Sequence, residues 1–207
     1  MSVIPTKTPE FVKSLFPNFV WHIDSTDNTL YLTFDDGPTP GVTEWVLDTL
    51  NAYNAKATFF CIGHNVKQAP HIYQRILDEG HTVGNHTFNH LKGWKVKTKA
   101  YMDNIALASD YIDSKLFRPP YGKLKIKQGK RLLKNGYHVV MWDVLSFDWD
   151  HNVSKEQCLA NVINTSKSGS IVVFHDSIKA QRNVQYALPK TLEYFSEKGY
   201  RFKRIEV

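Results

Sequence analysis

The chain has little of what builds disulfide-rich or membrane-spanning proteins. It holds only two cysteines, Cys61 and Cys158, which lie far apart within apolar patterns and are expected to be buried, reduced thiols. No apolar run approaches the roughly 20 residues that a membrane-spanning helix needs. The N-terminus has no apolar core of the signal-peptide type, because Pro5, Lys7 and Pro9 interrupt it. We therefore expect a cytoplasmic protein, or a secreted or periplasmic one if a leader is missing from this sequence.

Acidic residues are fewer than basic ones, with 20 Asp and Glu against 26 Lys and Arg, which gives a net charge of +6. The basic residues are scattered, and the one local cluster, at residues 92–99, is expected to be a solvated loop. A nucleic-acid partner is therefore not indicated. The 13% aromatic content, with five Trp and ten Tyr, is typical of a protein that stacks on apolar ligand faces such as sugar rings.

Strand-like and helix-like patterns alternate through one domain without a linker. Residues 42–50 have helical periodicity, whereas residues 57–62 and 170–174 are continuous apolar runs of the kind found in buried parallel strands. A helix passes through a Gly cap directly into a strand at residues 79–81, 135–137 and 198–200. About seven strands alternate with about six helices, which predicts a parallel sheet, either doubly wound or closed into a barrel.

Three local features are also predicted. Phe11, Leu15 and Phe16 indicate a short amphipathic turn that packs across the body of the protein. Residues 21–24 and 30–32 indicate a small hairpin. Pro189 is expected to occupy the first position of the last helix.

Polar residues follow the predicted strands at several places. The residues that come just after apolar runs are Asp35, Asp36, His86, His90, Arg118, Asp148 and His175. In a βα barrel the C-terminal end of every strand opens on the same face, where active sites are built. An open sheet gathers a site from fewer strands. Contributions from five strand ends therefore favour a barrel.

Two histidines have the spacing of a metal-binding pair. His86 and His90 are four residues apart, which is one turn of a helix and would place both imidazoles on one face. Taken alone in a chain with nine histidines, this spacing is more often a chance pair on a loop. The Glu that follows the first His in helical zinc proteases is missing, so a general base must come from elsewhere. A catalytic zinc site needs a third, anionic ligand and an open position for water. Asp36 is the candidate ligand, which leaves Asp35 as the candidate base.

Arg118 and His175 have both a structural and a functional interpretation. Arg118 lies in a proline-locked loop, where it is either a surface residue of a turn or a partner that orients Asp35 and lowers its pKa. His175 either caps a strand end or protonates a leaving group, with Asp148 stabilising the imidazolium.

These motifs, taken in order, resemble those of the polysaccharide deacetylase family, the NodB-homology domain of carbohydrate esterase family 4. The matching segments are residues 33–38 (TFDDGP), 84–90 (GNHTFNH), 117–122 (FRPPYG), 142–149 and 169–176. The resemblance implies a single-domain α/β fold, a distorted (β/α)7 barrel. It places the catalytic domain at residues 30–207, with residues 1–29 as an N-terminal extension packing on the barrel.

The same resemblance implies a role for each site residue. The implied metal ligands are Asp36, His86 and His90, and the implied metal is Zn²⁺, with Co²⁺ or another divalent ion as alternatives. The implied catalytic residues are Asp35 as general base, His175 as general acid, Arg118 as the partner of Asp35 and Asp148 as the partner of His175.

The resemblance also implies how the acetyl group is held. The backbone N–H of Tyr121 would help to stabilise an oxyanion, and Trp149 and Val173 would shape the acetyl pocket. Leu91, Leu145 and Val173 differ from the residues frequent in the family. These differences bear on pocket shape and substrate range, since no ligand or catalytic group is lost.

The implied function is metal-dependent hydrolysis of N-acetyl groups on N-acetylglucosamine-containing glycans of the chitooligosaccharide or peptidoglycan type, with release of acetate. One alternative is an O-acetyl esterase acting on acetylated xylan. Another is a non-catalytic glycan-binding relative, against which the intact set of catalytic residues argues. A phosphatase or nuclease is not supported, because the chain has no Gly-rich phosphate loop. The expected partner is an acetylated glycan, and the protein is expected to be a monomer.

Overall fold

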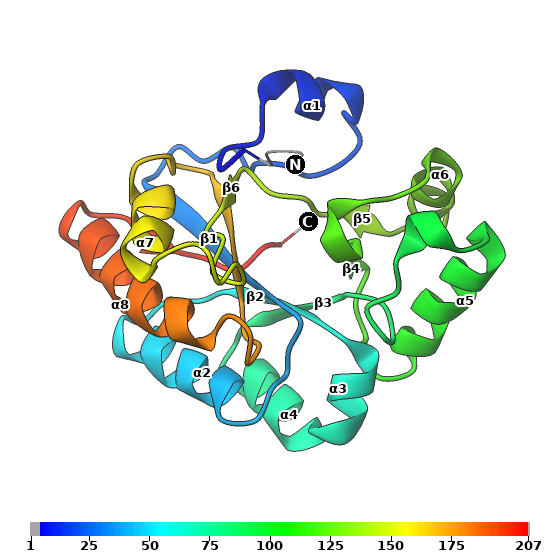
Figure 1. The fold of residues 1–207 in the computed structure, drawn as a ribbon, viewed down its shortest axis with the longest axis horizontal. Helices are drawn as coiled ribbons and strands as arrows, with labels where there is room; N and C mark the ends of the chain where they lie inside the picture. Colours follow the sequence, from blue (N-terminus) through cyan, green and yellow to red (C-terminus); the bar gives the residue numbers. More distant parts are fainter. Residues whose placement is uncertain (1–4, 207) are drawn as a thin grey trace.

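The computed structural model describes residues 5–206 as a curled parallel sheet with helices around it (Figure 1). The strands are β1 (Thr29–Asp35), β2 (Thr58–Cys61), β3 (Thr82–Asn85), β4 (Leu116–Phe117), β5 (His138–Val139), β6 (Val144–Leu145), β7 (Ile171–His175) and β8 (Arg201–Phe202). The α-helices are α1 (Glu10–Leu15), α2 (Val42–Ala52), α3 (Gly63–Gln68), α4 (Pro70–Asp78), α5 (Thr98–Ser109), α6 (Ile126–Lys134), α7 (Lys155–Ile163) and α8 (Gln181–Glu197). Two short 3-10 helices are η1 (Gly93–Lys95) and η2 (Pro120–Gly122). No helix in residues 5–206 is long and apolar enough to cross a membrane.

The sheet forms a half-barrel. Its strands pair in the order β5-β4-β3-β2-β1-β7-β6, and β8 pairs with the N-terminal end of β1. All of these pairings are parallel. Helices α2 to α8 lie outside the sheet on three sides (Figure 1). The predicted distorted barrel built on seven strands is therefore confirmed.

The N-terminal segment lies across the gap between the two ends of this strand path, β5 and β6. The Val20 N–H donates to the Val139 carbonyl at 2.8 Å, and the Met141 N–H donates to the Val20 carbonyl at 2.7 Å. The Thr8 N–H donates to the Asp143 carbonyl at 2.8 Å. These bonds satisfy backbone groups that an open edge would expose. The division between an extension at residues 1–29 and a domain at 30–207 stays a prediction.

Of the three local predictions, two are wrong and one is right in part. His22 pairs antiparallel with Ser170 instead of forming a hairpin with β1, because tertiary pairing competes with the local turn. Helix α1 confirms the short amphipathic turn, but it packs on the core through Val12, whereas Phe11 and Leu15 are each 68% exposed. Pro189 lies inside α8, where the buried apolar face of the helix offsets the lost backbone hydrogen bond.

Strand β1 separates a helix-facing core from the interior of the half-barrel, which holds a second, smaller apolar cluster around Tyr31. Successive strand residues point to opposite faces. Phe34 points toward the helices and stacks between Phe59 and Phe174, with ring centroids 5.0 and 6.1 Å away. Thr33 and Asp35, on the other face, are buried inside the half-barrel. The same alternation that builds the core thus places a carboxylate in the interior.

Both cysteines are buried and free, as predicted. Burial raises the pKa of the Cys61 thiol well above its ordinary value, and burial likewise raises the pKa of Cys158. Neither thiol is available as a thiolate near neutral pH.

Candidate active site

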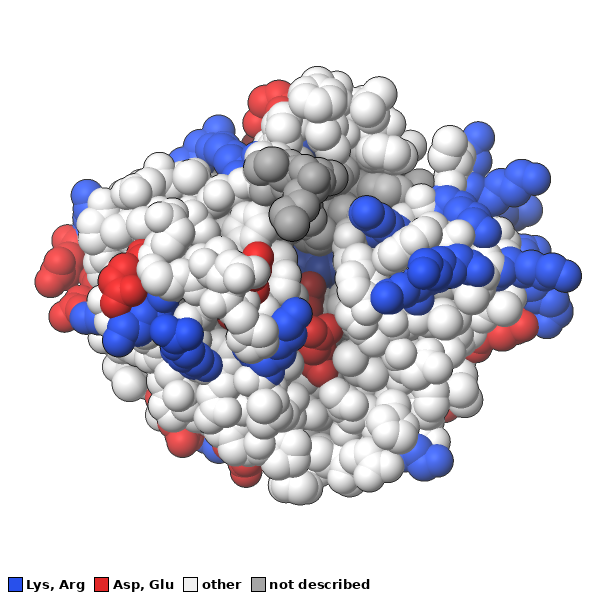
Figure 2. Space-filling view, in the orientation of Figure 1, with Lys and Arg blue, Asp and Glu red and all other residues white. Residues whose placement is uncertain are grey.

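A cavity of about 430 Å³ opens at the C-terminal ends of the strands. Of the residues singled out from the sequence, those lining it are Asp35, Asp36, His86, His90, Tyr121, Trp149, Val173 and His175. Arg118 and Asp148 lie behind this lining, 0% and 1% exposed. Figure 2 shows acidic side chains at the bottom of a hollow near the middle of this face. The structure therefore brings all ten predicted residues to one place.

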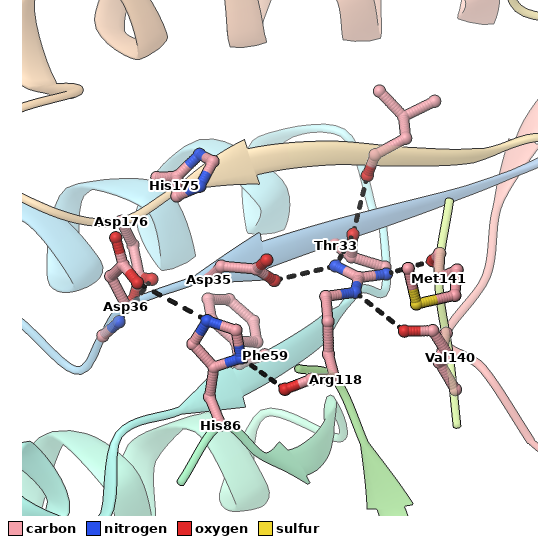
Figure 3. A network of polar contacts seen from close by, with 12 residues as sticks. Thr33, Asp35, Asp36, Phe59, His86, Arg118, Val140, Met141, His175 and Asp176 are labelled. Carbon is pink, nitrogen blue, oxygen red and sulfur yellow. Dashed lines mark hydrogen bonds and ion pairs between the residues drawn. The ribbon is translucent and has the colours of Figure 1, made fainter. Parts of the chain in front are cut away.

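The three predicted ligands converge. One ligand atom from each of Asp36, His86 and His90 lies within 4.8 Å of the other two. The Asp36 Oδ1 atom is 3.2 Å from His90 Nε2 and 3.6 Å from His86 Nε2 (Figure 3 shows the latter contact). This oxygen is buried and has no hydrogen-bond partner among residues 5–206. A buried, unpaired carboxylate oxygen beside two imidazoles is the donor set expected of a divalent metal site.

The imidazoles are in the form that binds metal. His86 Nδ1 lies 2.7 Å from the Arg118 carbonyl oxygen, so Nδ1–H donates and the Nε2 lone pair faces Asp36 (Figure 3). A backbone carbonyl that fixes the tautomer in this way is a usual partner of a metal-binding histidine. Burial and the neighbouring His86 lower the pKa of His90 to about 4, so its imidazole is neutral at pH 7. The residues present therefore fit a divalent cation.

The histidine pair is not helical, contrary to the reasoning from its spacing. His86 follows the end of β3, and residues 86–92 form a loop. Thr87 and His90 have positive φ angles of 66° and 56°, which fold the loop back so that both rings face Asp36. The spacing predicted the right pair through the wrong local structure.

Residues with left-handed backbone conformations are concentrated around the cavity. Among residues 5–206, six non-glycine residues have positive φ, and five of them lie in the loops and in η2 around the cavity: Asp36 (81°), Thr87, His90, Tyr121 (59°) and Phe147 (62°). Such conformations cost roughly 1–3 kcal/mol each and persist where the surrounding structure holds them. The loop geometry is thus held in place by the rest of the fold.

Asp35 is held by Arg118. Arg118 Nη1 donates to Asp35 Oδ1 and to Thr33 Oγ1, each at 2.7 Å (Figure 3). The guanidinium also donates to the carbonyls of Met141 and Val140 at 2.8 and 3.2 Å, so most of its donors are used. Burial opposes ionisation of Asp35, but the charge and hydrogen bond of Arg118, together with His86 and His175, outweigh it and hold the pKa of Asp35 below its usual range. Asp35 is consequently an ionised, oriented carboxylate.

His175 is held by Asp148. His175 Nδ1 lies 2.8 Å from Asp148 Oδ1, and the His175 backbone N–H donates to Asp148 Oδ2 at 2.7 Å. Burial favours neutral imidazole, but the charge and hydrogen bond of Asp148 outweigh it and raise the pKa of His175 to about 9. His175 therefore carries a proton at neutral pH, with Nε2 free to donate it.

The predicted acetyl-pocket residues form an apolar wall beside His175. Trp149 packs edge-on against His175 with ring centroids 4.7 Å apart, and it stacks on Phe147 at 5.1 Å. Val173 and Leu145, both almost fully buried, line the same cavity. An apolar wall of this kind suits a methyl group.

Sequence reasoning missed Asp176, a second buried carboxyl. Asp176 Oδ1 accepts from the Gly37 N–H at 3.0 Å, and Oδ2 accepts from the Thr43 hydroxyl at 2.6 Å. Any Cβ at Gly37 would overlap this carboxyl group. Burial raises the pKa of Asp176 to about 7. Asp176 thus fixes the loop that follows the ligand Asp36, a role that its position after His175 did not reveal.

The mouth of the cavity adds aromatic and basic residues that the sequence did not single out. Trp94 from η1 packs edge-on against Tyr121 at 5.4 Å, and Trp142 lines the cavity beside Gly122. Lys123 and Lys179 also line the cavity. The sequence signals for the two tryptophans were the high aromatic content and, for Trp142, its place at the start of the motif at residues 142–149.

Comparisons with known proteins agree with this geometry. The sequence profile described as polysaccharide deacetylase matches residues 22–140. The chain is 36% identical over 201 residues to a peptidoglycan-N-acetylglucosamine deacetylase of Bacillus cereus, covering 89% of this chain and 90% of the relative. It is 32% identical to the peptidoglycan-N-acetylmuramic acid deacetylase PdaA of Bacillus subtilis, covering 88% and 72%. The chain belongs to the polysaccharide deacetylase family.

Solved structures lead to the same family. A peptidoglycan N-acetylglucosamine deacetylase crystallised with 4-naphthalen-1-yl-N-oxidanyl-benzamide superposes with a TM-score of 0.88, at 32% identity, over 96% of this chain and 95% of that one. Some relatives are longer: the chain spans 39% of the peptidoglycan-N-acetylglucosamine deacetylase PgdA of Listeria monocytogenes.

Proposed function

We propose that the chain is a divalent-metal-dependent deacetylase. It hydrolyses N-acetyl groups on N-acetylglucosamine-containing glycans of the chitooligosaccharide or peptidoglycan type and releases acetate. The observation that carries this proposal is the meeting of a cation-binding triad, an ionised carboxylate and a protonated imidazole at one cavity. The substrates named for the relatives support the choice of glycan.

Asp36, His86 and His90 would hold the cation, for which we propose zinc, with Co²⁺ as a substitute. When bound, such a cation would polarise the acetyl carbonyl and make a water molecule more acidic. Asp35 accepts the proton that this water loses as it attacks the carbonyl carbon. Arg118 keeps Asp35 ionised and aimed at the cavity, because its hydrogen bonds fix the carboxylate.

The developing negative charge on the carbonyl oxygen needs a donor on the protein. The Tyr121 backbone, in its left-handed conformation at the cavity edge, is our candidate, because its N–H can donate to this oxygen. The tetrahedral adduct then breaks its C–N bond. His175 Nε2 gives its proton to the departing nitrogen, so the products are acetate and a glucosamine amine.

Two alternatives share the same scaffold. An O-acetyl esterase would need less from His175, because an alcohol leaves more readily than an amine. A non-catalytic glycan-binding protein would have no use for a base and an acid that are both buried, paired and held in their reactive protonation states. The strongly raised pKa of His175 therefore favours the amide substrate.

The site of action is also a proposal. Peptidoglycan lies outside the cytoplasm, and the relatives are named for it, so we propose an extracellular or periplasmic location. The cytoplasmic location and the monomeric state expected from the sequence stay predictions.

The test is acetate release by the purified protein, chelated and then resupplied with Zn²⁺ or Co²⁺. Chitooligosaccharide and acetylated xylan are assayed side by side. We expect cation-dependent acetate release that is faster from the amide substrate. Faster release from xylan would favour the esterase, and no release from either by metal-loaded protein would favour the binding protein.

A further inference from the structure

The positive charge of the chain is concentrated in one fifth of its length. Residues 92–134 hold twelve of the 26 Lys and Arg residues but only three of the 20 Asp and Glu residues. Outside this stretch acidic residues outnumber basic ones. The interpretation of scattered charge drawn from the sequence is therefore incomplete.

The fold turns this stretch into one basic surface beside the active site. Eleven of the twelve cations are exposed, all but Arg118, and ten of them form this surface: Lys92, Lys95, Lys97, Lys99, Lys123, Lys125, Lys127, Lys130, Arg131 and Lys134. They lie on η1, on α6, in the first turn of α5 and in the adjoining loops, and Figure 2 shows basic side chains gathered over this part of the molecule up to the edge of the central hollow. Among residues 5–206, only Lys99 of these ten pairs with an acid, Asp103, at 2.8 Å.

Two of these lysines join the basic surface to the mouth of the cavity. Lys92 Nζ lies over the Tyr121 ring, 5.0 Å from its centroid, and Lys123 Nζ lies 5.5 Å from the Trp94 ring. Tyr121, Trp94 and Lys123 also line the active-site cavity. A polymer bound in that cavity and extending out of its mouth on this side would therefore contact these two lysines.

A second cavity, of about 660 Å³, continues from the first. The two share Trp94, Pro119, Gly122 and Lys123. The apolar side of the second cavity is built by the N-terminal segment and α6, for example by Phe19 and Leu133. Lys125 and Lys130 line it as well. The result is an apolar groove with a cationic rim.

We propose that this groove binds short acidic peptides attached to the glycan strand. This inference rests on the proposed function, because it assumes a glycan in the active-site cavity. Lysine ammonium groups on the rim would pair with scattered carboxylates, while the apolar side would receive small apolar side chains such as methyl groups. A phosphate polymer or nucleic acid is a poorer fit, because it would pair with the lysines but would leave the apolar side of the groove uncovered.

The test compares glycan strands of equal length with their peptides intact and with their peptides removed. Binding of labelled strands is measured as Kd, and acetate release is measured as KM, for the metal-loaded protein. The test variant is Lys125→Glu/Lys130→Glu. The matched control, Lys190→Glu/Lys203→Glu, makes the same charge change at exposed positions outside the groove.

We expect the unaltered protein to bind peptide-bearing strands at least fivefold more tightly than stripped strands, with a preference that shrinks as salt rises. The test variant should lose this preference, keep its affinity for stripped strands and keep its melting temperature, while the control keeps the preference. Equal affinity for both strands, or tighter binding of polyphosphate than of peptide-bearing strands, would overturn the inference.

Failure of the proposed function would look different. Acetate release from stripped strands without any peptide preference would overturn this inference and leave the deacetylase intact. A clear binding preference without acetate release from either strand would support the groove and contradict the deacetylase.

Discussion

The floor and the rim of the active-site cavity are built in opposite ways. On the floor, Asp35 and His175 lie at strand ends, and each is paired with a partner, Arg118 or Asp148, that is at most 1% exposed. On the rim, Tyr121 comes from the short helix η2, is 51% exposed and is held by ring contacts. The floor therefore fixes protonation and position, which chemistry requires, whereas the rim offers adaptable surface, which recognition of a polymer requires.

The two regions should also differ in energy. Removing one partner of a buried ion pair leaves an uncompensated charge and costs roughly 3–5 kcal/mol, while an exposed pair contributes roughly 0–1 kcal/mol. Substitutions on the floor should thus abolish turnover or destabilise the fold. Substitutions on the rim should change KM.

The largest effect is expected for His90→Ala on the floor. Loss of one of the three ligands should remove both the bound cation and the activity, because two remaining ligands hold zinc weakly. Metal analysis after gel filtration and acetate release would check this. His151→Ala, at an exposed histidine away from the triad, is the control and should keep both. A variant at position 90 that is active without metal would contradict the ligand assignment.

The next effect is on stability. Arg118→Ala should lower the free energy of unfolding by roughly 3–5 kcal/mol, because Asp35 would stay buried without its partner. The exposed pair Arg204–Glu206 supplies the control, and Arg204→Ala should cost at most about 1 kcal/mol. Urea unfolding curves would measure both. Similar losses of unfolding free energy in the two variants would contradict the expected energetic difference between the buried and the exposed ion pair.

A smaller effect concerns pH. The pKa of His175 is raised above its ordinary value to about 9, so the protonated form and the stability it contributes are complete at low pH and are lost as pH rises through about 9. The alkaline limb of kcat/KM should therefore fall near pH 9. Asp148→Asn removes the charge that raises this pKa and should move the alkaline limb to lower pH. The pH profile of kcat/KM for this variant would measure the change. An unchanged limb would show that His175 is not the titrating acid.

The smallest effect is expected on the rim. Trp94→Ala removes an aromatic face at the junction of the two cavities, and KM should rise roughly threefold to tenfold with kcat little changed. Steady-state kinetics on chitooligosaccharides of increasing length would check it, and the effect should grow with length. A loss in kcat alone would contradict this and would indicate that Trp94 affects the chemical step, as the residues of the floor do.

The sequence predicted the floor well and the surroundings poorly, for physical reasons. Polar residues directly after apolar runs predict a shared face because parallel strands end together, and Asp35, His86 and His175 follow this rule. The sequence also predicted correctly that His90 binds metal together with His86. It predicted the wrong local structure, because residue spacing does not reveal the positive φ angles that turn the His90 ring toward Asp36. Asp176 was missed because its partners, Gly37 and Thr43, are far away in the sequence.

The basic surface and the pairing of the N-terminal segment could not be predicted either, because both depend on contacts between residues that are far apart in the sequence. Lys92 and Lys123 are separated by a helix and a strand, and only the fold brings their ammonium groups to neighbouring rings. Residues 21–24 have a hairpin-like pattern, yet His22 pairs with Ser170, which no local signal predicts.

The central claim is that the floor separates two carboxylates by task, with Asp36 binding the cation and Asp35 taking a proton. Metal content and acetate release measured on the same preparation of Asp35→Asn test it most directly. We predict one equivalent of bound zinc, as in the unaltered protein, with turnover lowered by a factor of roughly 10²–10⁴ or more. Loss of zinc from this variant, or turnover close to normal, would contradict the division of roles.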